Sequence, residues 1–131
     1  KAARNHRHAP FGMFTHHQSM VFSREILSKS RIRYNLDYPI AADYDFVLRF
    51  LDKSKNVTCY LGLISNFSAG GVSQVRHHAG RREQFLVRKR HFKSGTFATR
   101  VYAMQIASKY LRMIAPKLYW QVRTIYVNIF R

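Results

Sequence analysis

The chain has 131 residues, 23 Lys and Arg against 6 Asp and Glu, and a formal net charge of +17 at pH 7. This length suits one ordinary domain, and a hydrophobic content of 47% excludes the weakly hydrophobic class of disordered proteins. The single cysteine, Cys59, excludes an internal disulfide, and no apolar run reaches the ~20 residues that a membrane-spanning helix needs.

The charges are unevenly distributed along the chain. All the acids lie between positions 25 and 83, at Glu25, Asp37, Asp43, Asp45, Asp52 and Glu83. From Gln84 to Arg131 no acid occurs, whereas Lys and Arg recur throughout that stretch. Such a segment favours an anionic partner, which is a phosphate group, a nucleic acid or an anionic lipid surface.

The first forty residues predict short elements joined by loops. Residues 1–15 are rich in His and Arg and read as irregular, and residues 17–22 (HQSMVF) read as a strand-like or buried run. Ser23 is expected to cap a short helix over 24–30, because its hydroxyl can accept a hydrogen bond from a first-turn amide. Residues 31–39 are expected to form a loop.

The middle of the chain predicts one helix, one strand and a turn. In residues 41–53, apolar side chains recur at helical spacing on one face, at Phe46, Val47, Phe50 and Leu51. Residues 56–67 alternate apolar and polar side chains, as a β-strand does, and a turn is expected at Gly70 and Gly71.

Helical patterns dominate the remainder, over residues 80–92, 97–115 and 117–131, with Pro116 interrupting the last two. We therefore expect a domain over residues 1–95 and a basic, amphipathic helical tail over residues 96–131.

Asp43 and Asp45 are the first candidate site residues. Acids are common in the first turn of a helix, where the dipole and unpaired amides favour them, so a capping role is the simpler interpretation. The alternative is that one of them is a general base, which a helix N-terminus would help to keep ionised.

Two further clusters are weaker candidates. The adjacent pairs His16-His17 and His77-His78 have no Cys or acid spaced near them as a further ligand, so no metal site is expected. The turn at Gly70, Gly71 and Ser73, followed by Arg81 and Arg82, would suit a diphosphate, although glycine pairs alone most often mark plain turns.

The order of these segments resembles the C-terminal half of a family 2 glycosyltransferase of the GT-A type, closest to bacterial enzymes of exopolysaccharide, capsule or O-antigen synthesis. The matching segments are HQSMVFSREIL, AADYDFVLRF, SNFSAGGVS and RREQFLVRK, over roughly residues 9–92. The resemblance implies that Asp43 is the catalytic base of an inverting, hexosyltransferase-like reaction, with Ala42 where many relatives have glutamate. It also implies substrate-binding roles for His17, Gln18, Asp45, Gly70, Gly71, Ser73, Arg81 and Arg82.

The resemblance further implies an α/β fold, of which this chain would be the acceptor-side part with a helical extension. The nucleotide-binding half, with its Asp-x-Asp motif for Mg²⁺ or Mn²⁺, is not matched here, so we expect a fragment that is inactive alone. Asp43-Tyr44-Asp45 has the Asp-x-Asp spelling, but its place on a helix after the acceptor segment argues against a metal role. The expected partners are a nucleotide sugar and a glycan or lipid-linked acceptor, at the cytoplasmic face of the plasma membrane.

The tail lies beyond the resemblance. Its cations alternate with Tyr and Trp side chains, which suits a helix lying on anionic lipid; solvated cations on helices packed elsewhere are the simpler alternative. A different class of function, a non-catalytic module that binds nucleic acid or an anionic membrane, is kept as an alternative. Of these two partners, nucleic acid is less favoured than a membrane, because the sequence lacks RNP-type, zinc-finger and basic-zipper patterns.

Overall fold

The computed structural model describes residues 5–60, 62 and 76–129, and these residues form helices and irregular segments without any strand. The chain divides into two compact units, Lys1–Ser94 and Gly95–Arg131. In the second unit, the side chains at 122, 123 and 125–129 are not described.

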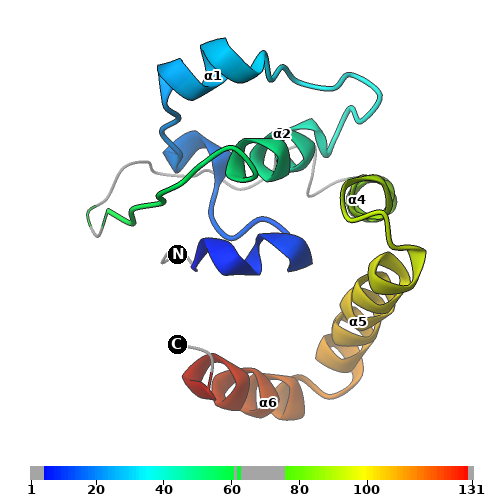
Figure 1. The fold of residues 1–131 in the computed structure, drawn as a ribbon. Coiled ribbons are helices and arrows are strands. Elements are labelled where there is room, and N and C mark those ends of the chain that lie inside the picture. The colour runs from blue at the N-terminus through cyan, green and yellow to red at the C-terminus, as the bar shows by residue number, and fades with distance from the viewer. Residues whose placement is uncertain (1–4, 61, 63–75, 130–131) are drawn as a thin grey trace. The chain divides into compact units, whose positions relative to one another are not determined.

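The first unit is built around a central helix, α2 (Ala42–Leu51). Figure 1 shows α2 between α1 and the N-terminal 3₁₀ helix, with α4 beside it. The other elements of this unit are η1 (His6–Phe11), η2 (His17–Ser19), α1 (Arg24–Ser30) and α4 (His77–His91).

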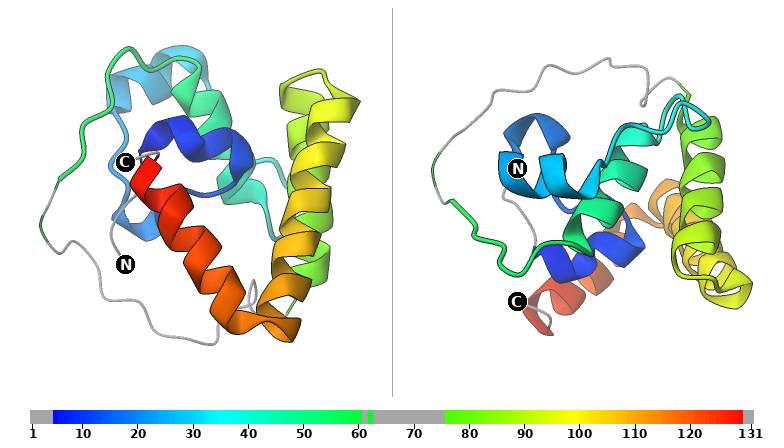
Figure 2. Two further views of the ribbon diagram at one scale, coloured as in Figure 1. Left: turned by 90° about the horizontal axis from the view of Figure 1, so that it is seen from below. Right: turned by 45° about the horizontal axis from the view of Figure 1, so that its top comes forward.

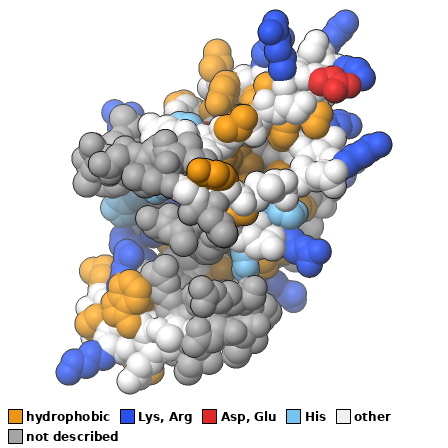
Figure 3. Space-filling view, turned by 90° about the vertical axis from the view of Figure 1, so that its left-hand side faces the viewer, with side chains coloured by type: hydrophobic (Ala, Val, Ile, Leu, Met, Phe, Trp, Pro, Cys, Tyr) orange, Lys and Arg blue, Asp and Glu red, His pale blue; other side chains and the backbone are white. Residues whose placement is uncertain are grey.

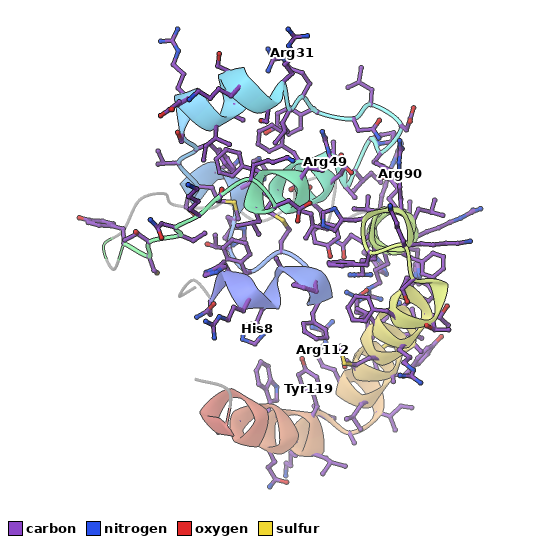
Figure 4. All side chains as sticks on the ribbon, in the orientation of Figure 1. His8, Arg31, Arg49, Arg90, Arg112 and Tyr119 are labelled. Carbon is purple, nitrogen blue, oxygen red and sulfur yellow. The ribbon has the colours of Figure 1, made fainter. Side chains whose placement is uncertain are left out.

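The ends of α1 follow from its sequence. The Ser23 hydroxyl accepts a hydrogen bond from Ile26 N at 3.4 Å, which confirms the predicted cap. Arg31 has a φ of 52°, in the left-handed region that commonly ends a helix. Figure 4 places Arg31 at this end, where the chain leaves α1 for the loop that leads to α2.

One side of α2 packs against α1 and the segment before it. Phe46, Val47 and Phe50 are buried together with Ile32, as the helical spacing predicted, and Phe22 packs against them. The Phe22 ring stands edge-on to the rings of Phe46 and Phe50, with centroids 5.2 and 4.9 Å apart. Edge-to-face pairs at this separation stabilise an aromatic core beyond the area that they bury.

The opposite side of α2 packs against η1 and α4. Tyr44 and Leu48 of α2, Ala9 of η1 and Val87 of α4 belong to one buried cluster. The Tyr44 hydroxyl lies 2.9 Å from Ala9 O and 3.1 Å from Pro10 O, to which it donates. This hydroxyl therefore ties α2 to backbone carbonyls in the last turn of η1, of which Ala9 O also accepts from Gly12 N at 3.1 Å.

The fully buried Arg88 of α4 completes the same contact. Its Nε donates to Pro10 O at 3.0 Å, and its Nη2 donates to Phe11 O and Gln84 Oε1 at 3.4 and 3.2 Å. The guanidinium also lies 5.4 Å from the centre of the Tyr44 ring, in cation–π geometry. A buried charge is tolerated only when polar groups surround it, so these contacts determine how η1, α2 and α4 fit together.

The second unit is a pair of helices, α5 (Gly95–Ile114) and α6 (Pro116–Ile129), joined by Ala115 alone. Proline disfavours helical geometry in the residue before it but suits the first position of a new helix, so the pattern breaks where the sequence predicted. The two helices meet at an angle, as both views in Figure 2 show. Among the described residues, no helix combines the length and apolar character needed to cross a membrane.

The expected α/β fold is wrong for the described residues. Residues 17–22 begin with the 3₁₀ helix η2 instead of a strand, and residues 56–60 are irregular and exposed. Alternation alone cannot make a strand, because each strand needs a neighbour for its backbone hydrogen bonds, and the described residues supply none. The expected strand's remaining residues, 61 and 63–67, lie outside the described ranges, as does the turn at Gly70 and Gly71.

Two local predictions also change. Residues 6–11 form η1 where an irregular segment was expected, with the Asn5 side chain accepting a hydrogen bond from Arg7 N at 2.9 Å. Helix α4 begins at His77, three residues before the predicted start, because Gly80 is accommodated inside its first turns.

The Arg88 contact leads to a stability prediction. Replacing Arg88 with Met should lower the free energy of unfolding by about 2–4 kcal/mol, because the carbonyls of Pro10 and Phe11 lose buried donors. Arg90→Met, in the same helix but exposed, is the matched control and should change it by less than about 0.5 kcal/mol. Urea unfolding followed by circular dichroism measures the free energy of unfolding of both variants. Equal unfolding midpoints would contradict a stabilising role for the Arg88 contact.

A pH dependence follows from the same cluster. Burial raises the pKa of Tyr44 above its ordinary value of 10.0, and the neighbouring Arg88 offsets part of that rise. The folded chain thus holds this proton more tightly than the unfolded chain does, so the contribution is complete below pH 10.0 and is lost as the pH rises through the folded pKa. The urea midpoint should therefore fall more steeply above that pH in the wild type than in Tyr44→Phe; parallel curves would exclude Tyr44 as the cause.

Candidate functional site

The candidate site lies at the N-terminal turn of α2, where Asp43 is the second helical residue. Its Oδ1 accepts a hydrogen bond from Tyr44 N at 2.7 Å, and its Oδ2 lies 3.3 Å from Nδ1 of His17. The side chains of Asp43 and His17 are 30% and 48% exposed. The two side chains therefore form a partly exposed pair that solvent can reach.

Hydroxyl contacts hold the short helix η2 in the position that presents His17. The Ser19 hydroxyl donates to His16 O at 2.8 Å, and Ser19 Oγ lies 3.3 Å from Thr15 Oγ1. The backbone amides of Ser19 and Met20 donate to the carbonyls of His16 and His17, each at 3.0 Å. Half-buried Met20, directly after η2, packs against the aromatic cluster on α2. Contacts therefore hold η2 both before and after its three residues.

A carboxylate from α4 caps the start of α2. Ala41 occupies the N-cap position and has no side chain that can accept a hydrogen bond. Instead, Glu83 Oε2 accepts from the backbone amides of Ile40 and Ala41, both at 2.8 Å. A glutamate normally serves this purpose from the third position of the same helix; here it comes from a helix about forty residues further along.

Close approach of the chain at Gly80 helps Glu83 to reach α2. Gly80 is buried, and a Cβ atom added there would lie 3.1 Å from Cγ2 of Ile40. The missing side chain lets α4 lie against Ile40, two residues before α2, at a point one turn ahead of Glu83. The glutamate can therefore extend its carboxylate to the two amides.

Asp45 faces a different neighbour. Its Oδ2 accepts from Nη2 and Nε of Arg49 at 2.6 and 2.9 Å, and its side chain is almost completely buried. Arg49 Nη2 also donates to Arg33 O at 2.6 Å, so the pair ties the loop after α1 to α2. Figure 4 shows Arg49 on α2, below the part of the chain that carries Arg31.

The other predicted site residues are not gathered at Asp43 by any described contact. Gln18 follows His17 and is exposed, while Arg81 and Arg82 lie in α4, half-buried and exposed respectively. Gly70, Gly71 and Ser73 lie outside the described residues. Of the predicted set, His17 and Asp43 are the two that a described contact brings together.

The sequence interpretation missed the roles of Glu83, Tyr44 and Arg88. A signal for Glu83 was present, because it is the last acid of the chain and stands among Arg81, Arg82 and Arg88. An isolated acid in a strongly basic helix indicates a specific partner. Nothing in the sequence indicated that the partner would be a pair of backbone amides.

The described residues contain no cluster of side chains typical of a protein metal site. Within residues 5–60, 62 and 76–129, no three His, Cys, Asp or Glu side chains converge as metal ligands. Asp43 has one neighbouring ligand type, His17, and Asp45 is engaged by Arg49. The described residues therefore contain no cluster of three side chains for the Mg²⁺ or Mn²⁺ that the resemblance implies.

This arrangement leaves one carboxylate available for chemistry. Asp43, Asp45 and Glu83 all approach the first turn of α2, but Glu83 is used by two amides and Asp45 by Arg49. Asp43 is partly exposed and lies in the positive end of the helix dipole. It can accept a proton or a hydrogen bond from a bound hydroxyl, with His17 orienting it.

Comparison with protein-family models, with curated proteins and with solved structures finds no match to this chain.

The cap from α4 predicts a local effect on amide exchange. In Glu83→Ala, the amides of Ile40 and Ala41 lose their acceptor, so both should exchange faster with deuterium, and the chain should lose about 1–3 kcal/mol of stability. Glu25→Ala is the control, because Glu25 is exposed and pairs with Lys29 on its own helix. Hydrogen exchange followed by NMR measures the exchange rates of the two amides. Unchanged protection of both amides in Glu83→Ala would exclude the cap.

Proposed function

We propose that this chain is the acceptor-side part of a family 2 glycosyltransferase that transfers a sugar from a nucleotide-sugar donor to a glycan or lipid-linked acceptor. The setting would be surface polysaccharide synthesis at the cytoplasmic face of the plasma membrane. The observation that carries the proposal is the pairing of Asp43 with His17, two residues that the motif order assigns to one site. The contact joins segments that are 26 positions apart in the sequence.

The proposed reaction is a single displacement with inversion. Asp43 accepts the proton of the acceptor hydroxyl, and the acceptor oxygen forms a bond to the anomeric carbon of the donor sugar. The bond from that carbon to the diphosphate oxygen breaks at the same time, and the nucleoside diphosphate leaves with the electron pair. The proton stays on the Asp43 carboxylate until solvent removes it.

The environment of Asp43 suits this role better than that of its neighbours. A general base needs an oxygen that the substrate can reach and a geometry that other groups hold in place. Asp43 meets both conditions, because Tyr44 N and His17 hold its two oxygens while the side chain stays partly exposed. Asp45 is buried against Arg49, and Glu83 is committed to two amides.

The proposed reaction does not depend on an α/β fold in the described residues. In the proposed reaction, the described helices supply the groups that act on the acceptor, namely a carboxylate, a histidine and the contacts that support them. The donor's diphosphate and any metal ion would be bound outside the described residues, so no step is assigned to them.

Replacing Asp43 with Asn tests the proposal. The assay combines this chain with a nucleotide-binding half and measures sugar transfer to isolated lipid-linked acceptors from a panel of nucleotide sugars. Asn keeps the shape but cannot take up the proton, so kcat should fall roughly 100- to 10,000-fold. Transfer at a near-normal rate in Asp43→Asn would exclude Asp43 as the base.

Two further variants separate chemistry from folding. Asp37→Asn removes an exposed acid in the loop before α2 and should leave both kcat and stability unchanged. His17→Gln should lower kcat by a smaller factor than Asp43→Asn, with KM nearly constant, because His17 positions the carboxylate and does not take the proton. A fall in all variants alike would indicate a general loss of folding.

A further inference from the structure

The last turn of α5 presents large apolar side chains to solvent. Tyr110, Met113 and Ile114 are 55%, 66% and 82% exposed. They stand at positions i, i+3 and i+4 of one helix and therefore share one face. Single exposed apolar residues are ordinary, but neighbours that form a continuous patch mark an interaction surface.

Cations border this patch on one side. At about 100° per residue, the order around the helix is Arg112, Lys109, Met113, Tyr110 and Ile114. Met113 therefore lies in the middle of the arc, with the cations before it and the apolar side chains after it. This is the pattern of a helix that lies at a boundary between water and an apolar phase.

Further exposed side chains follow across the junction, in the first turns of α6. Pro116 begins α6 directly after Ala115, and the next turn exposes Lys117, Leu118 and Trp120. Figure 4 marks Arg112 and Tyr119 on the two sides of this junction. We call Lys109, Tyr110, Arg112, Met113, Ile114, Lys117, Leu118 and Trp120 the junction surface.

Charge indicates what the junction surface contacts. No acid occurs anywhere from Gln84 to Arg131, so an anionic surface meets no repulsion from this unit. Figure 3 shows the same bias on one face of the molecule, where Lys and Arg are frequent and acidic side chains are scarce. Each cation near an anionic bilayer is attracted to it, and Tyr and Trp suit the headgroup region because they combine an apolar ring with a polar tip.

A membrane fits the junction surface better than a nucleic acid does. A nucleic acid would engage the cations and could stack on Tyr110 or Trp120, but it would leave Met113 and Ile114 in water. The acyl boundary of a bilayer covers those two side chains as well. The exposed aliphatic residues therefore decide between the two anionic partners.

We propose that the junction surface binds anionic membranes, with Met113 and Ile114 entering the acyl boundary and Lys109, Arg112 and Lys117 against the headgroup phosphates. The helices lie on the bilayer and do not cross it. This inference rests on exposure and charge in the second unit and is independent of the reaction assigned to Asp43. It can therefore hold even if the proposed transferase activity fails its test.

The experiment is co-sedimentation of the full chain with vesicles of phosphatidylcholine that contain about 30% phosphatidylglycerol. The double variant Met113→Ser, Ile114→Ser should lower the partition coefficient about tenfold or more, because it removes the side chains that enter the bilayer. The matched control is Val21→Ser, Leu36→Ser, which removes comparable apolar side chains that are 91% and 86% exposed in the first unit. The control should partition like the wild type, and circular dichroism checks that both variants stay folded.

The single tryptophan provides a second readout. Trp120 belongs to the junction surface, so its emission should shift to shorter wavelength on these vesicles and be quenched by brominated lipids. Equal binding to vesicles of phosphatidylcholine alone would overturn the role of the cations.

Three results would overturn insertion itself. The first is an unshifted Trp120 emission. The second is binding that about 0.5 M salt abolishes and the serine pair does not affect, which would be plain charge attraction. The third is a serine pair that converts a dimer to a monomer while vesicle binding stays the same, which would make the junction surface a contact between two copies of the chain.

Discussion

The buried guanidinium of Arg88 against the carbonyls of Pro10 and Phe11 is the contact on which the first unit depends. It joins α4 to a segment nearly eighty residues earlier. The Tyr44 hydroxyl joins α2 to the same segment, through Pro10 O, which both residues contact, and through Ala9 O. Burying a charged group is costly unless polar groups surround it, and Nε and Nη2 of Arg88 find theirs in this segment and in Gln84, which leaves few arrangements of these three elements. The apolar cluster of Ala9, Leu48 and Val87 then fills the space around the polar contact.

The position of α4 that this contact imposes also determines the candidate site. Glu83 lies five residues before Arg88, on the same helix, and reaches the amides of Ile40 and Ala41. Since these amides precede α2, their capping supports the helix start that carries Asp43. A distant polar contact thus supports the residue assigned to catalysis, without touching it.

The two units use their charge in different ways. In the first unit, nearly every described acid has a defined partner, as in the pairs of Asp45 with Arg49 and of Asp52 with His91. The second unit contains no acid, and it exposes aliphatic side chains beside its cations. An external anionic surface is the natural complement of such a unit. If the proposed reaction uses a lipid-linked acceptor, attachment to the membrane would bring enzyme and acceptor into one plane.

Local sequence determined the helices of this chain, because their signals lie within a few residues: the Ser23 cap, the spacing of Phe46, Val47 and Phe50, and the break at Pro116. The order of the motifs assigned Asp43 and His17 to one predicted site, and the structure brings the two side chains into contact. The sequence led to the wrong fold class because alternation at Val57 and Cys59 says nothing about whether a partner strand is present. The Asp45–Arg49 pair forms within one helix and is therefore local. Only the tertiary structure decided that Glu83 is engaged by the amides of Ile40 and Ala41 and that His17 lies beside a partly exposed Asp43. The physical reason is that these groups lie far apart in the sequence, so that only folding brings them together.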